Sequence, residues 1–148
     1  GCDGIAIGSD GARLYYCPLV SRHLYSVSID ALVDPRLTDR QVAATVIDHG
    51  EKGASDGLES DDKGRIYATS YEQNAILRLL PEGGLETIVR DPRVLWPDTM
   101  SVARNGYLYF IANQLHRQAR FNRGIDRRQK PYVLFRVRLD AGPVRLVR

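Results

Sequence analysis

The chain has 148 residues, of which 43% are hydrophobic and 26% charged, and its formal net charge is +3. These values are typical of an ordinary globular domain and argue against disorder. No apolar stretch of about 18 residues is present, so the sequence predicts no membrane-spanning helix. Eight Tyr, 13 Gly and seven Pro favour strands joined by many turns, and we therefore expect an all-β protein.

Three segments of the chain repeat one pattern, in which an acidic residue opens a strand, a tight turn contains Gly, and a second strand carries Tyr. The leading acids are Asp3, Asp56 and Asp98, spaced by 53 and then 42 residues. Asp-Gly and Asn-Gly turns supply the positive φ angles that close short hairpins. These turns fall at 9–11, 62–64 and 105–106.

Two further strands are expected after each hairpin. The third strands are predicted at 24–27, 75–79 and 132–137, and the fourth strands at 44–47, 85–89 and 144–147. Four strands per repeat, at a period of roughly 40 to 50 residues, are typical of a β-propeller. The sequence therefore predicts three four-stranded blades, at about residues 1–50, 51–92 and 93–148, which make half of a six-bladed ring.

The spacing of 53 residues from Asp3 to Asp56, against 42 from Asp56 to Asp98, indicates an insertion in the first repeat, at 30–41. Thr38 and Gln41 have the spacing of a capping box there, which predicts one short helix and almost no helix elsewhere. Three blades cannot close a ring. Because the chain opens at Gly1 without an initiator Met, we expect a cut N-terminus. The remaining blades would come from a missing N-terminal half, the option we favour, or from a second copy.

Six short motifs occur in order along nearly the whole chain. They read CDGIA (2–6), LYYCPL (14–19), SRHLYSV (21–27), SDGLE (55–59), LWPDT (95–99) and NQLHR (113–117). Together they resemble the C-terminal half of the yellow/major royal jelly protein family, in its bacterial branch. That resemblance implies a six-bladed propeller. Members of the family range from insect pigmentation proteins linked to dopachrome conversion to nutritive and amine-binding proteins, so the family does not select one activity.

The strand starts are also distantly similar to those of gluconolactonase/regucalcin-type propellers. In those enzymes Asn, Asp and Glu side chains hold a divalent cation at the ring axis. The resemblance places Asp3 at the Asn position and Asp56 at the Asp position. It implies Ca²⁺ or another divalent cation as a cofactor, with the Glu contributed from outside this chain.

The innermost strands of a propeller converge on its central channel, so Asp3, Asp56 and Asp98 are expected to approach one another there. Carboxylate oxygens suit a hard cation. The alternative is that each Asp caps its own turn. Trp96 precedes Asp98 at a strand entrance, where it could stack on a flat ligand or serve as a core anchor.

His23 and His116 are candidates for a general base or a ligand nitrogen, because imidazole titrates near neutral pH. The alternative for both is ordinary packing. Six basic residues between Arg117 and Lys130 could steer an anionic ligand, although we favour a solvated loop. We expect neither a membrane nor a nucleic acid as a partner.

Cys2 and Cys17 lie on the two arms of the first hairpin, nearly opposite each other when counted from the turn. Opposed residues can be spanned by a disulfide, which would imply a secreted or periplasmic protein. The competing interpretation is two free thiols in a cytosolic protein.

Nucleotide-binding and serine-hydrolase motifs are missing from the sequence. We expect a propeller that binds a small polar or aromatic ligand at the channel mouth. The alternatives are a metal-dependent lactone hydrolase, a dopachrome-type isomerase, and a structural or interaction propeller.

Overall fold

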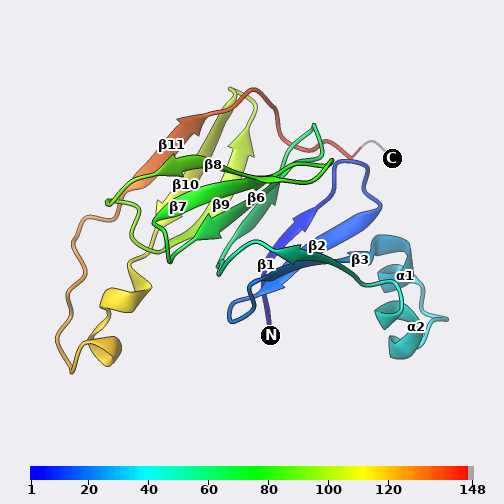
Figure 1. Cartoon of the computed structure of the whole chain (residues 1–148), viewed down its shortest axis with the longest axis horizontal. Helices are drawn as coiled ribbons and strands as arrows, with labels where there is room; N and C mark the ends of the chain where they lie inside the picture. The colour runs from blue at the N-terminus through cyan, green and yellow to red at the C-terminus, as the bar shows by residue number, and fades with distance from the viewer. Residues whose placement is uncertain (147–148) are drawn as a thin grey trace.

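The computed structural model describes residues 1–146 and consists almost entirely of β-structure, which confirms the expected partial propeller. Its eleven strands form three antiparallel sheets, arranged side by side as blades (Figure 1). Blade 1 consists of β1 (Cys2–Ile7), β2 (Arg13–Pro18), β3 (His23–Ser28) and β4 (Ile47–Glu51). Blade 2 consists of β5 (Leu58–Ser60), β6 (Ile66–Ser70), β7 (Ala75–Leu79) and β8 (Leu85–Arg90). Blade 3 consists of β9 (Pro97–Ala103), β10 (Tyr107–Ala112) and β11 (Leu134–Arg138).

Each blade begins with the hairpin that the repeat predicted. The turn glycines Gly11, Gly64 and Gly106 have φ angles of 70°, 77° and 76°. Side chains with a Cβ rarely adopt these angles, which explains why Gly recurs at this point of the repeat.

Helical structure is more frequent than expected. The capping box of Thr38 and Gln41 is present and starts α2 (Asp39–Ala43), as predicted. A second short helix, α1 (Ile29–Val33), and two 3₁₀ turns, η1 (Leu115–Arg117) and η2 (Ala119–Phe121), were not expected. Because Ala44 caps α2, strand β4 begins at Ile47 instead of Ala44. Within residues 1–146 no helix is long and apolar enough to cross a membrane.

The predicted fourth strand of blade 3 is wrong for the residues that the structure describes. After β11 the chain crosses to the hairpin turn of blade 2, where Gly142 and Asp62 exchange hydrogen bonds and Pro143 bridges Asp61. Proline lacks the N–H that a ladder requires, which disfavours a strand at this point. Val147, the last residue of the predicted strand, lies outside the described residues.

Two apolar clusters lie between the blades. The first, between blades 1 and 2, contains Ala6, Cys17, Leu24, Leu58, Ile66 and Ala68. The second, between blades 2 and 3, contains Tyr67, Ile76, Val94, Met100, Val102, Leu108, Phe110 and Leu139. The blades are thus held face to face by ordinary hydrophobic packing.

The innermost strands approach each other unusually closely. A Cβ placed on Gly57 would lie 2.0 Å from the carbonyl oxygen of Asp98, and one on Gly4 would lie 2.9 Å from that of Asp56. The Gly of each Asp-Gly pair is therefore required where the next blade's strand start packs against it. Thr99, which stands in place of Gly in blade 3, lies in β9, whose far side meets no further blade within residues 1–146.

Two side chains of β5 form hydrogen bonds with the innermost strands of the neighbouring blades, β1 and β9. The Ser60 hydroxyl donates to the Ile7 carbonyl at 2.6 Å, and the Glu59 carboxylate accepts from the Val102 amide at 3.4 Å. Burial raises the pKa of Glu59. These two side chains tie the three blades together along the channel.

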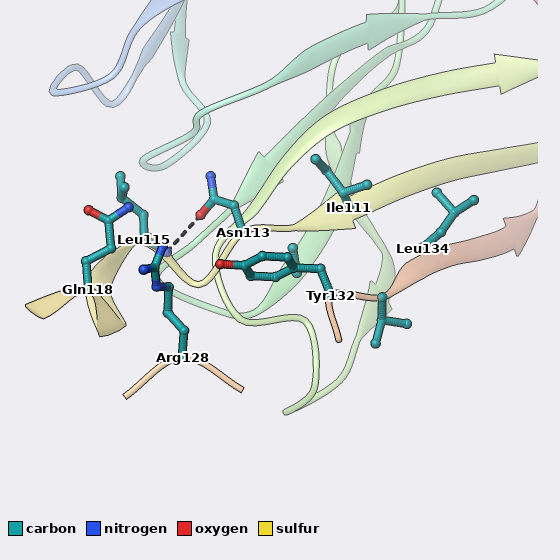
Figure 2. A pocket seen from close by; sticks show the side chains of 9 residues that line it. Ile111, Asn113, Leu115, Gln118, Arg128, Tyr132 and Leu134 are labelled. Carbon is teal, nitrogen blue, oxygen red and sulfur yellow. Dashed lines mark hydrogen bonds between the residues drawn. The ribbon is translucent and has the colours of Figure 1, made fainter. Parts of the chain in front are cut away.

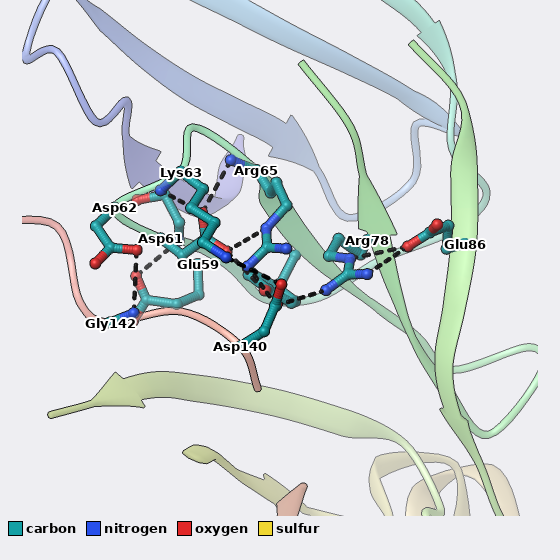
Figure 3. A network of polar contacts seen from close by, with 11 residues as sticks. Glu59, Asp61, Asp62, Lys63, Arg65, Arg78, Glu86, Asp140 and Gly142 are labelled. Carbon is teal, nitrogen blue, oxygen red and sulfur yellow. Dashed lines mark hydrogen bonds and ion pairs between the residues drawn. The ribbon is translucent and has the colours of Figure 1, made fainter. Parts of the chain in front are cut away.

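A network of charged groups joins blade 2 to the segment after β11 (Figure 3). The fully buried carboxylate of Asp61 accepts from Arg65 Nε at 2.6 Å and from the Tyr67 hydroxyl at 2.7 Å. Arg65 also forms an ion pair with Asp140 at 2.8 Å. Buried charges persist when paired and hydrogen-bonded in this way.

Candidate functional site

The three leading carboxylates line one pocket at the end of the channel where the inner strands begin. The pocket has a volume of about 280 Å³ and is bordered by Asp3, Asp56 and Asp98 with the residues that follow them. Asp3 lies in β1, Asp98 lies in β9, and Asp56 lies two residues before the first residue of β5. The structure therefore brings together the side chains that the repeat placed at equivalent positions.

Asp56 is the most buried of the three, with 8% of its surface exposed. Its backbone N–H and that of Gly57 both donate to Thr69 Oγ1, at 3.0 and 2.9 Å, which fixes the start of β5. Burial, and to a smaller extent the neighbouring charges of Asp98 and Asp3, raise the pKa of Asp56 to about 6 against the opposing hydrogen bond from the Trp96 indole. This carboxyl therefore titrates close to neutral pH.

Trp96 is held in place by the carboxylate and by two aromatic neighbours. Its indole N–H donates to Asp56 Oδ2 at 2.6 Å. Its ring stacks on Tyr71, with centroids 4.2 Å apart and planes 5° from parallel, and lies 5.8 Å from the ring of His116. The φ angle of Trp96 is 60°, an unusual value for a bulky side chain that marks a constrained backbone.

His116 and Asn113 complete the site from the loop after β10. Asn113 Nδ2 donates to Asp98 Oδ2 at 2.8 Å, and Asn113 Oδ1 accepts a hydrogen bond from the backbone amide of Leu115. Burial lowers the pKa of His116, so this ring is more often neutral than an exposed histidine at the same pH. An uncharged imidazole next to Trp96 extends the stack without adding a cation.

The sequence analysis did not identify Tyr71 or Asn113. Both follow the second strand of their blades, as Leu19 does in blade 1, and the Tyr71 hydroxyl donates to the Leu19 carbonyl at 3.0 Å. Aligning the three repeats beyond their second strands would have drawn attention to these positions. The signal was weak because the three residue types differ.

His23 does not belong to this pocket. It lies in β3, the third strand outward from the channel, where its Nδ1 is hydrogen-bonded to Asp48 on β4 at 2.8 Å and its ring stacks on Tyr25. The strand order places it too far from the inner strands to join the carboxylates.

The expected disulfide is not formed in this structure, where Cys2 is exposed, Cys17 is buried and both thiols are free. The β1–β2 register pairs Cys2 with Pro18 and Cys17 with Gly4, because the ladder shifts between Cys2 and Gly4. That irregularity removes the direct opposition on which the prediction depended.

Carboxylate oxygens are suitable ligands for a divalent cation, but too few of them converge here to hold one. Within residues 1–146, no three Asp, Glu, His or Cys side chains converge in a way that could hold a metal ion. One oxygen of Asp56 is bonded to Trp96, and one of Asp98 to Asn113. Asp3 and Asp56 would therefore need ligands beyond those of the described chain to hold a cation.

A second cavity of about 470 Å³ lies beside the site, on blade 3 (Figure 2). Asn113 borders this cavity and donates a hydrogen bond to Asp98 of the carboxylate pocket, so one hydrogen bond connects the walls of the two hollows. The remaining walls are mostly apolar, with polar contributions from Gln118, Arg128 and Tyr132. Figure 2 shows these three side chains gathered on one side of Asn113.

Solved structures similar to this chain are propeller proteins. A gluconolactonase from Xanthomonas campestris aligns with a TM-score of 0.68 at 19% identity, over 97% of this chain and 46% of its own. A luciferin-regenerating enzyme aligns with a TM-score of 0.62 at 17% identity, over 96% of this chain and 46% of its own. A streptogramin B lyase aligns with a TM-score of 0.55 at 17% identity, over 76% of this chain and 34% of its own.

This chain thus spans less than half the length of these structures, and at such identities the likeness concerns the fold alone. No curated protein sequence matches it. The family profile described as Major royal jelly protein, in contrast, matches residues 1–145, nearly the whole chain. The chain therefore belongs to the major royal jelly protein family.

Proposed function

We propose that the pocket at the strand starts binds a small aromatic ligand that carries a positive charge. The observation that carries this proposal is the contact between the Trp96 indole and Asp56, which joins an aromatic stack to three carboxylates in one pocket. An ionised carboxylate attracts a cation, and an aromatic face attracts both a flat ring and an ammonium group. Both attractions act on one ligand only where the two groups are adjacent.

The roles of the residues follow from the contacts. Asp56 and Asp98 would compensate the ligand's charge, and the exposed Asp3 would strengthen the local negative potential. Trp96 and Tyr71, whose mutual stacking fixes both planes, would provide aromatic contact beside the carboxylates through the parts of the rings that the stack leaves uncovered. Hydrogen bonds from Trp96 and Asn113 hold the two carboxylates in position before any ligand arrives.

The test uses Trp96, the single tryptophan, as an intrinsic fluorescent probe. Phenethylamine and the neutral 2-phenylethanol are titrated at pH 7.5, and we expect the amine to bind at least about 10-fold more tightly, equivalent to about 1.4 kcal/mol. Asp56→Asn should reduce this preference, since Asp98 and Asp3 remain, and leave binding of the alcohol unchanged. Asp30→Asn, an exposed acid on α1, is the matched control and should change neither. Equal binding of both compounds, or an unchanged preference in Asp56→Asn, would contradict the proposal.

A lactone hydrolase is the second candidate, because the gluconolactonase-like fold is combined here with carboxylates at the channel. A bound divalent cation supplies a Lewis acid for such chemistry. In this chain Asp3 and Asp56 would provide part of its ligands. Lactone turnover that requires added Ca²⁺ or Mn²⁺, and that Asp56→Asn abolishes, would favour the hydrolase over the binding protein.

A further inference from the structure

The loop between β10 and β11 concentrates positive charge. Residues 117–130, called here the cationic loop, contain six of the 21 basic residues of the chain and one of its 18 acidic residues, Asp126. The loop thus carries a net charge of +5, and the rest of the chain carries −2. The basic character of this protein is a property of one loop.

Most of this charge is not neutralised by neighbouring acids. Elsewhere the arginines are commonly paired, as in Arg22 with Glu51 and Arg78 with Glu86. In the cationic loop, the only ion pair within residues 1–146 joins Arg128 to Asp126. The cations without such a pair are Arg117, Arg120, Arg123, Arg127 and Lys130.

The loop is nevertheless ordered by its own hydrogen bonds. The Gln114 side chain both donates to and accepts from the backbone of Gln129, at 2.8 Å each way, and so closes the loop at its base. The Arg127 amide donates to the Arg117 carbonyl at 2.9 Å, and the Asn122 side chain donates to two further carbonyls. Such bonding is not needed for a merely solvated loop, and it orders the backbone from which the arginines extend.

Two large apolar side chains are exposed among these arginines. Phe121 is 57% exposed and Ile125 is 59% exposed. The Arg120 guanidinium lies 4.5 Å from the centre of the Phe121 ring. In Figure 1 the backbone of this segment, coloured yellow to orange before β11, extends away from the three blades.

We propose that the cationic loop docks this protein peripherally onto an anionic lipid surface. Basic side chains are attracted to acidic headgroups, and exposed apolar side chains can enter the boundary of the acyl region. A soluble polyanion would use the arginines but gain little from Phe121 and Ile125. The combination of both residue classes on one ordered loop therefore favours a lipid surface, and it requires no membrane-spanning segment.

The test is flotation of the whole protein with two kinds of vesicle. We expect binding to phosphatidylcholine vesicles that contain about 30 mol% phosphatidylserine, and none to phosphatidylcholine alone. The triple variant Arg120→Gln, Arg123→Gln, Arg127→Gln should partition about a hundredfold more weakly. The charge-matched control, Arg36→Gln, Arg40→Gln, Arg93→Gln, removes three exposed arginines outside the cationic loop and should bind as the wild type does.

A second variant separates a lipid from a soluble polyanion. Phe121→Ser with Ile125→Ser keeps every charge and should still weaken vesicle binding several-fold, most visibly at high salt, where electrostatic attraction is screened. Circular dichroism of each variant verifies that it is folded. Equal loss in the control variant would show a net-charge effect and overturn the proposal. So would heparin binding as tight as vesicle binding, together with no effect of the Phe121 and Ile125 changes.

Discussion

The indole N–H of Trp96 donates a 2.6 Å hydrogen bond to a carboxylate, that of Asp56, which belongs to the preceding blade. This contact crosses the boundary between blades 2 and 3 at the strand starts. It couples the protonation of the most buried acid in the pocket to the environment of the single tryptophan.

The first prediction concerns the titration of Asp56, whose pKa is raised to about 6 by burial and by nearby acids. Trp96 fluorescence should change around pH 6, because ionising Asp56 places a charge on the atom that accepts the indole hydrogen bond. Asp56→Asn should remove that transition. Binding of a cationic ligand should strengthen as pH rises through the same range, since only the ionised acid attracts it.

The same pKa shift has a consequence for stability. From an ordinary pKa of 3.8 up to about 6, the folded state holds a proton on Asp56 that the unfolded state has lost. The free energy of unfolding should therefore decrease as pH rises from about 4 to about 6, with a contribution from this acid of about 2–3 kcal/mol. Urea denaturation at pH 4.5 and 7.5 measures this, and Asp56→Asn should show a smaller difference. A larger difference in the variant would contradict the prediction.

The second prediction concerns the glycine at the tightest contact between blades. Gly57→Ala should destabilise the protein by about 3 kcal/mol, because the new Cβ would meet the Asp98 carbonyl at 2.0 Å and backbone atoms must move. Gly4→Ala should have a smaller effect, since its contacts begin at 2.9 Å and include the flexible Leu58 side chain. Thermal denaturation of both variants gives the order, and a reversed order would refute this account of the repeat.

The third prediction concerns the buried charge network. Asp61→Ala should lower the free energy of unfolding by about 3–5 kcal/mol, because it leaves Arg65 buried without one of its two acids and Tyr67 without its acceptor. Asp91→Ala removes an exposed pair with Arg93 and serves as the control. Chemical denaturation should show almost no change for this control. Similar losses in both variants would argue against a special role for the network.

The fourth prediction concerns the two cysteines. In the native protein, alkylation followed by mass spectrometry should modify Cys2, which is exposed, and spare the buried Cys17 until the protein unfolds. Burial and nearby groups raise the pKa of Cys2, so its reaction should accelerate as pH rises above neutrality. A protein that accepts no label until it is reduced would instead contain the Cys2–Cys17 disulfide and support export.

Much of the fold follows from local sequence patterns. The tight turns require positive φ angles at Gly11, Gly64 and Gly106. The capping box of Thr38 and Gln41 starts a helix by bonds within four residues. Such local features can be predicted from the sequence without knowledge of the tertiary contacts. The three leading acids were found in the same way, because repetition of a local pattern implies equivalent positions in equivalent blades.

Packing between distant segments decided the rest. Asp56 meets Trp96, 40 residues further along, only because adjacent blades stack, and Tyr71 and Asn113 reach the site for the same reason. His23 was excluded by its strand's distance from the channel. The segment after β11 does not pair with blade 3, and the Gly142 amide instead donates a hydrogen bond to Asp62 of blade 2. The sequence by itself determined the hairpins, the repeat and the equivalence of the acids, since these depend on turn chemistry within a few residues. Only the tertiary structure decided that Asp56 is buried and hydrogen-bonded to the Trp96 indole. Burial and its effect on pKa arise from groups that are brought together across the blades.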